Sequence, residues 1–114
     1  MGYCYILSEV VMNMMEIEGK FKTLKYFVDG YYNQSIDDHE FDDMIREFRD
    51  EEPESLVHAL RAELAELQKL IDNGDRETFK KIEILLHDNS LRYIEFEDGQ
   101  AFINRVLNVL DNKN

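Results

Sequence analysis

The chain of 114 residues has very little cysteine, proline and glycine, with one Cys, one Pro and five Gly. Cys4 has no second cysteine to pair with, so it cannot form an internal disulfide. Without clustered histidines it cannot build a zinc site either. Nothing in the cysteine content therefore points to an oxidising compartment. The scarcity of proline and glycine, beside abundant Leu, Glu and Lys, favours a helical protein.

Positive charge is also scarce, because 13 Lys and Arg face 25 Asp and Glu and leave a net charge of −12. A nucleic-acid binder needs cations to displace the counterions of the phosphates, and this chain would repel such a backbone. An anionic membrane surface is disfavoured for the same reason. The charge balance predicts no nucleic-acid or membrane partner and favours a basic protein partner.

Long hydrophobic runs are missing as well. Glu9 interrupts the apolar stretch near the N-terminus, and no Lys or Arg precedes Lys20. The stretch therefore fits neither a signal peptide nor a membrane-spanning helix. We predict a cytoplasmic protein.

Apolar residues recur at the three- and four-residue spacing of helices along most of the chain. Residues 91–97 break this pattern and are predicted to be an irregular, extended connector, since one short strand would have no partner. We predict an all-α fold, a compact single-domain bundle of five or six helices over residues 1–114, with 1–20 as an N-terminal extension helix. The predicted helices cover residues 6–17, 21–33, 36–50, 53–72, 76–87 and 99–111.

Local signals mark several helix ends. Ser35 is predicted to cap the helix over 36–50, Asn73-Gly74 to stop the long helix, and Asp75 to cap the next one. Gly19 and the Asp88-Asn89-Ser90 run are predicted to end helices. Gly30 interrupts a helical pattern at a cost of about 1 kcal/mol relative to Ala, so we expect close packing or special backbone geometry there. The predicted core contains Phe27, Tyr31, Phe41, Phe48, Leu60, Leu64, Leu67, Ile82, Leu86, Val106 and Leu110.

No pattern of catalytic residues occurs in the sequence. The three histidines fall on different predicted elements, and no phosphate loop, glycine-rich fingerprint or nucleophile elbow is present. His39 follows Asp37 and Asp38, which could form a metal cluster, but an exposed polar turn is the preferred interpretation. We predict that the protein is not an enzyme and has no catalytic residue, cofactor or metal.

Acidic residues are concentrated between residues 37 and 54, where ten acids face Arg46 and Arg49 and give −8 of the total −12. On a helical projection the apolar residues of 36–50 gather on one side. The carboxylates of Asp43, Glu47 and Asp50 fall opposite, with Asp42 beside them. Two interpretations stay open from the pattern alone. The acids form a solvated face that keeps the protein soluble, or a docking surface for a cationic partner.

Aromatic residues crowd the stretch before the acidic helix. Phe27 and Tyr31 share the apolar face of their helix, and Tyr26 and Tyr32 cannot both join them. At least one of those two tyrosines should therefore lie near the surface. Tyrosine is a favoured interface anchor, and Tyr32 is our candidate. The alternative is an amphipathic tyrosine with a packed ring and a hydrated hydroxyl.

The run LKYFVDGYYNQ at residues 24–34 resembles the signature of one group of contact-dependent growth inhibition immunity proteins, which are small bacterial proteins. The features that follow are similar in type and order: an acidic helix, a Pro-Glu helix start at Pro53, a long Leu/Glu helix with Glu63, and a C-terminal helix that starts near Gly99. The resemblance covers about residues 21–111. Asn33 stands where the group has His, and Ser35-Ile36 replaces Asp-Trp.

The resemblance implies an immunity protein that binds the toxic C-terminal domain of a delivered effector inside the bacterial cytoplasm. Many such toxins are nucleases with basic substrate clefts, so the carboxylates would stand where phosphates would bind. Neutralisation would then occur by occlusion of the active site or substrate cleft, in a 1:1 heterodimer. The predicted partner-binding residues are Tyr32, Asp42, Asp43, Glu47 and Asp50. The alternative is an acidic helical interaction or regulatory module that homodimerises.

Overall fold

A computed structural model describes residues 13–111, and six α-helices form most of this part of the chain. A short 3₁₀ helix, η1 (Asp38–Glu40), leads into the helix labelled α4, and no strand occurs among the described residues. The predicted all-α class is confirmed. The helices are α2 (Met14–Lys20), α3 (Lys22–Tyr31), α4 (Phe41–Glu51), α5 (Glu54–Asp72), α6 (Arg76–Ser90) and α7 (Phe96–Asp111).

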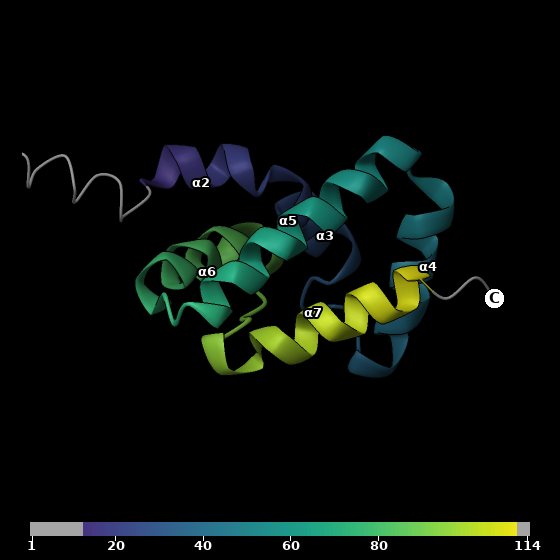
Figure 1. Cartoon of the computed structure of the whole chain (residues 1–114). Coiled ribbons are helices and arrows are strands. Elements are labelled where there is room, and N and C mark those ends of the chain that lie inside the picture. The colour runs from purple at the N-terminus through teal and green to yellow at the C-terminus, as the bar shows by residue number, and fades with distance from the viewer. Residues whose placement is uncertain (1–12, 112–114) are drawn as a thin grey trace, which may run out of the picture.

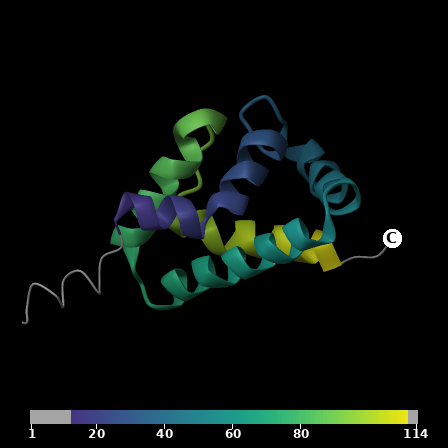
Figure 2. The same cartoon turned by 90° about the horizontal axis from the view of Figure 1, so that it is seen from above.

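The two long helices α5 and α7 run along the molecule and pack on each other (Figure 1). The α6 helix lies towards one end and α4 towards the other, with α2 beside α6. The view from above shows that α3 and α6 cover the same side of this pair (Figure 2). In consequence α4 packs mainly on α7, whereas α3 packs on both α5 and α6.

One hydrophobic core joins all six helices, and its largest fully buried side chains are phenylalanines. Every predicted core residue is buried except Tyr31, which is half-buried and packs against the core. The hydroxyl of Tyr31 explains this position, because it donates to the carboxylate of Glu52 at 2.7 Å instead of entering the core. A buried tyrosine hydroxyl needs such a partner.

The start of α3 is capped from another helix. Phe21 occupies the N-cap position and has no side-chain oxygen that could accept a hydrogen bond. The carboxylate of Glu63, on α5, accepts the N–H of Leu24 at 2.7 Å and the N–H of Thr23 at 3.3 Å. Glu63 is buried, and burial raises the pKa of its carboxyl although the two N–H groups act in the opposite direction.

The predicted start of the acidic helix is wrong. The Ser35 hydroxyl donates to the side chain of Asn33 inside a turn, so Ser35 caps no helix. The chain enters η1 two residues later, where the N–H of Asp37 donates to the carboxylate of Glu40 at 3.0 Å. The α4 helix then begins at Phe41.

The connector between the last two helices is confirmed, but its bounds differ from the prediction. The α6 helix continues to Ser90, so the run Asp88-Asn89-Ser90 lies inside the helix and does not break it. The Ser90 hydroxyl donates to the carbonyl of Leu86, one turn earlier in the same helix. Leu91 ends the helix with a φ of 58°, and residues 91–95 are irregular. The α7 helix begins early, at Phe96, whose ring packs edge-on against Phe79 with 5.2 Å between centroids.

The glycines differ in what they do. Gly74 has a φ of 68° and ends α5, as predicted, and Asp75 caps α6. Gly19 lies inside α2 and does not end it. The expectation for Gly30 is wrong, because it has an ordinary helical backbone and an added Cβ would meet no atom within 4 Å. The crowded position is Gly99, where a Cβ would lie 2.9 Å from Ile71 Cδ1 and 3.0 Å from Phe79 Cζ.

The N-terminal predictions fall largely outside the described residues. The structure describes the chain from residue 13 onward, so Cys4 and residues 6–12 of the predicted helix over 6–17 lie outside it. The first described helix is α2, which Asn13 caps in a reciprocal arrangement with Glu16. The assignment of 1–114 to one domain, with 1–20 as an extension, stays a prediction.

Candidate functional site

The predicted orientation of the acidic helix is correct. On α4, Phe41, Ile45 and Phe48 are buried, and the opposite side carries exposed carboxylates. The side chains of Asp43 and Asp50 are 81% and 62% exposed, and Glu47 is exposed between them. We call Asp43, Glu47 and Asp50 the acidic face. Among the described residues, their ion pairs come from α4 itself, since Arg46 contacts Asp43 at 2.7 Å and Arg49 contacts Asp50 at 2.9 Å.

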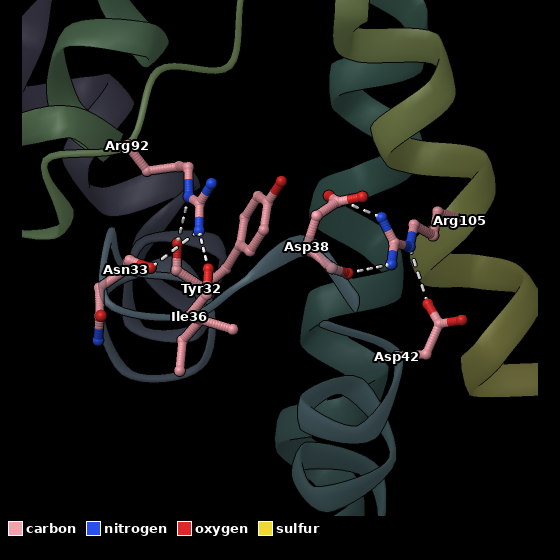
Figure 3. Close-up of polar contacts among 7 residues, drawn as sticks. All are labelled: Tyr32, Asn33, Ile36, Asp38, Asp42, Arg92 and Arg105. Carbon is pink, nitrogen blue, oxygen red and sulfur yellow. Dashed lines mark hydrogen bonds and ion pairs between the residues drawn. The ribbon is translucent and has the colours of Figure 1, made fainter. Parts of the chain in front are cut away.

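Asp42 lies beside this face and is held by α7 (Figure 3). Arg105 donates from Nε to Asp42 Oδ1 at 2.8 Å and from Nη1 to Asp38 Oδ1 at 3.0 Å. Its Nη2 donates to the backbone carbonyl of Asp38 at 2.6 Å, and the guanidinium lies 5.0 Å from the centre of the Phe41 ring. One arginine thus fixes η1 and the first turn of α4 against α7.

Tyr32 is half-buried between two side chains. Its ring stacks on Phe41 with 3.7 Å between centroids, and the guanidinium of Arg92 lies 4.0 Å from its centre. Arg92 also donates to the carbonyls of Tyr32 at 3.1 Å, of Asn33 at 3.0 Å and of Ile36 (Figure 3). Arg92, which lies in the connector, therefore holds the turn that follows Tyr31 and Tyr32.

Two tyrosines of α3 meet at the far end of α4. The hydroxyls of Tyr26 and Tyr31 both donate to Oε2 of Glu52, at 2.6 Å and 2.7 Å. These two bonds lower the pKa of the Glu52 carboxyl. The ring of Tyr26 is 48% exposed, which confirms that at least one tyrosine of the pair Tyr26 and Tyr32 lies near the surface.

A cleft of about 230 Å³ opens beside Asp42, between η1, the connector and α7. Its aromatic floor is formed by Tyr32, Phe41 and Phe102, whose rings are within 25° of parallel. We call it the aromatic cleft. The remaining lining residues are Asp38, Tyr93, Ile94, Asp98, Ala101 and Arg105.

The structure thus joins the predicted residues with others that sequence reasoning missed. The acidic face stands alone on α4, whereas Tyr32 lies in the floor of the aromatic cleft and Asp42 binds Arg105, a residue that lines it. Arg92 and Arg105 were missed because their partners lie about 60 residues away in the sequence. The aromatic residue Tyr93, exposed in an irregular connector, was the one available signal.

Metal clusters and membrane-spanning helices are both missing from the described part of the chain. Across residues 13–111, no three side chains of His, Cys, Asp or Glu come close enough together to hold a metal ion. This includes Asp37, Asp38 and His39. Over the same described range, no helix is both long and apolar enough to span a bilayer.

A sequence model of the CdiI immunity protein family matches residues 20–87, which is more than half of the chain. The chain belongs to the CdiI immunity protein family. Membership makes this CdiI protein a toxin-neutralising immunity protein that binds a cognate toxin. The suspected relation to contact-dependent growth inhibition immunity proteins is thereby confirmed. No curated protein and no solved structure matched the chain.

The match ends inside α6, so it includes Tyr31, Tyr32 and the acidic face but neither the connector nor α7. Arg92 and Arg105 nevertheless hold the matched turn and the matched acidic helix. In this CdiI protein, the geometry of the matched region therefore depends on residues beyond it.

Proposed function

We propose that this CdiI protein neutralises a nuclease toxin by placing its acidic face in the basic cleft that binds the toxin's substrate. The observation that carries the proposal is the exposure of Asp43, Glu47 and Asp50 within a segment of net charge −8. Asp43 and Glu47 are four residues apart, and like charges at that spacing cost a few tenths of a kcal/mol. The ion pairs that Asp43 and Asp50 make within the described residues are with Arg46 and Arg49 of α4, so they do not join this helix to another element.

The acidic face would affect the rates at which the complex with the toxin forms and dissociates. Carboxylates at the rim of an interface accelerate association with a cationic partner, and those that become desolvated also slow dissociation. Asp42 would join them, because Arg105 uses only its Oδ1 and leaves Oδ2 for a cation of the toxin. Tyr32 would contribute the edge of its ring at the aromatic cleft. The complex would be a 1:1 heterodimer in the bacterial cytoplasm, and the immunity protein would perform no chemistry.

The test uses the toxic C-terminal domain of the cognate contact-dependent growth inhibition effector. Asp43, Glu47 and Asp50 are replaced together by Lys, which changes the net charge from −12 to −6. Because these positions face away from the core, the helical circular dichroism should be retained. We expect association with the toxin domain to slow at least about tenfold at low salt, and its salt dependence to flatten.

A second triple variant controls for net charge. Glu18, Asp72 and Glu77 are exposed and lie on α2, α5 and α6. Replacing them by Lys gives the same net charge of −6 away from α4. We expect this control to change the association rate much less than the acidic-face variant. Equal slowing by both variants would show that the acids act only through the total charge of the protein.

Occlusion of the substrate cleft has its own test. If the immunity protein occupies that cleft, a nucleic acid bound by the toxin domain and the immunity protein should exclude each other in a competition experiment. A catalytically inactive toxin domain permits the measurement at equilibrium. A stable ternary complex of toxin, nucleic acid and immunity protein would contradict occlusion and place the contact at an exosite.

A further inference from the structure

We propose that the aromatic cleft receives a single arginine side chain of the toxin, as a second contact beside the acidic face. This inference rests on the proposed function, since it takes the basic toxin as the partner. The size of the cleft favours a side chain. Its volume of about 230 Å³ is below the roughly 300–1,000 Å³ of pockets for small molecules.

The rim offers one free carboxylate. Asp98 lies in the first turn of α7, is exposed, and pairs with no side chain within the described residues. Its neighbour Glu97 is different, because Glu97 contacts Arg76 at 2.6 Å and borders another cleft. The other acid that lines the cleft, Asp38, already binds Arg105. Asp98 is therefore the group in this cleft that an incoming cation would find unpaired.

The rim also offers one open aromatic face. The ring of Tyr93 stacks on His87 with 4.2 Å between centroids, yet Tyr93 stays 65% exposed. A planar guanidinium can stack on such a ring and bind a carboxylate with two hydrogen bonds at the same time. A lysine ammonium lacks the planar surface and the paired donors. The combination of Tyr93 and Asp98 therefore selects arginine.

The same chemistry already occurs three times among residues 13–111. Guanidinium groups lie 4.0 Å from the centre of Tyr32, 5.0 Å from Phe41 and 4.3 Å from Phe96. The first two belong to Arg92 and Arg105, which lie over Tyr32 and Phe41 of the cleft floor. The outer face of Tyr93 is left uncovered among the aromatic rings that line the cleft.

The backbone before Tyr93 is strained without benefit to the core. Leu91 has a φ of 58°, a conformation that L-residues other than Gly, Asn and Asp adopt rarely. Its side chain is 50% exposed, so burial does not offset the strain. This turn directs Arg92 to the Tyr32–Ile36 carbonyls and leaves Tyr93 at the cleft. The left-handed conformation of Leu91 also ends α6, where its N–H donates to the carbonyl of His87 at 3.0 Å.

The experiment compares two variants of equal charge. Asp98→Asn removes the carboxylate at the cleft, and Glu97→Gln removes one charge at the adjacent position. Affinity for the toxin domain is measured by titration calorimetry at fixed salt. We expect Asp98→Asn to weaken binding at least about tenfold and Glu97→Gln less than about threefold, since exposed ion pairs such as Glu97–Arg76 contribute little. Equal effects of the two variants would overturn the proposal.

The ring and the arginine are tested separately. Tyr93→Phe should bind like wild type, and Tyr93→Ala should lose about tenfold in affinity, because the ring and not the hydroxyl makes the contact. Each arginine of the toxin domain is then changed to Lys. One of these changes should weaken wild-type binding yet have little further effect on the Asp98→Asn protein, as a double-mutant cycle requires. If no toxin arginine is coupled to Asp98, the proposal is wrong.

The outcomes separate this inference from the proposed function. If the triple change of the acidic face weakens binding while Asp98→Asn and Tyr93→Ala do not, the cleft is not part of the interface and the proposed function stands. If the cleft variants weaken binding and the acidic-face variant does not, the interface lies at the cleft alone. If the wild-type protein does not bind the toxin domain, both proposals fall.

Discussion

Removing the carboxylate of Glu63 should uncap α3 from a distance of 40 residues along the chain. Glu63→Ala leaves the N–H groups of Thr23 and Leu24 without their acceptor in a buried site. An unsatisfied buried donor costs about 1–3 kcal/mol. Loss of an N-cap side chain costs about 0.5–2 kcal/mol, and the 3.3 Å bond is the weaker of the two. We expect Glu63→Ala to lower the free energy of unfolding by about 3 kcal/mol.

Glu63→Gln should cost less, about 1–2 kcal/mol, because its amide oxygen can keep the 2.7 Å bond to Leu24 while its NH₂ group faces a donor. The variant also isolates a pH effect. Burial raises the pKa of the Glu63 carboxyl above its ordinary 4.5 in the folded protein. The folded state therefore binds this proton more tightly than the unfolded state. The contribution of Glu63 is fully present below 4.5 and decreases as the pH rises through the folded pKa.

The assay is urea denaturation followed by circular dichroism between pH 5 and pH 8, above the isoelectric point near 4.5. The difference in unfolding free energy between wild type and Glu63→Gln should shrink as the pH rises. Glu66→Gln is the matched control on the same helix. Glu66 contacts Lys20 at 3.0 Å and Lys69 at 3.1 Å, and these bonds lower its pKa. Its contribution is complete above 4.5, so the difference should be below about 1 kcal/mol and constant over this range.

Two results would refute this reasoning. A loss below about 1 kcal/mol for Glu63→Ala would show that water or a rearranged side chain satisfies the α3 donors. A wild-type advantage over Glu63→Gln that grows with pH would show that the carboxylate is stabilised on folding, so that the N–H groups outweigh burial.

The remaining predictions concern two glycines and one arginine. Gly30→Ala should raise the free energy of unfolding by about 0.5–1 kcal/mol, because the site is open and alanine favours helix. Gly99→Ala should lower it by about 1–3 kcal/mol, since its Cβ would press on Ile71 and Phe79, and thermal melts of the two variants should shift in opposite directions. Arg92→Lys keeps the charge but loses the forked contact with three carbonyls, so the amide of Gln34, which donates to Ser90, should exchange hydrogen faster. Unchanged exchange at Gln34 would mean that the turn holds its shape without Arg92.

The parts of the fold that were predictable from sequence depend on local signals. The 53–72 stripe corresponds to α5, and the Gly74 stop and the Asp75 cap act within a few residues of their own position. Predictions of helix bounds failed where the local structure depends on which partner a side chain contacts. Ser35 bonds to Asn33 in a turn, and Phe96 extends α7 because it packs on another helix. Neither of these two contacts can be predicted from the spacing of residues in the sequence.

The candidate site divides in the same way. The orientation of the acidic face follows from the periodicity of one helix, and it was predictable for Asp43, Glu47 and Asp50. The surroundings of Asp42 and Tyr32 were not, because they depend on Arg105 and Arg92 from distant elements. A charged residue in a sequence does not reveal whether its side chain meets solvent, a carboxylate or a row of backbone carbonyls. Long-range contacts of this kind require the packing of the whole bundle.

The bond between Arg105 and Asp42 has a consequence for synthesis on the ribosome. The two residues are 63 positions apart, so roughly 3–13 s separate them at about 5–20 residues per second. During that interval the part of the α4 apolar stripe that packs on α7 is uncovered, and Asp42 lacks its cation from α7. The aromatic cleft becomes a finished surface only when α7 emerges and docks, because Ala101, Phe102 and Arg105 line it. A newly made molecule therefore completes the aromatic cleft only after α7 has been synthesised.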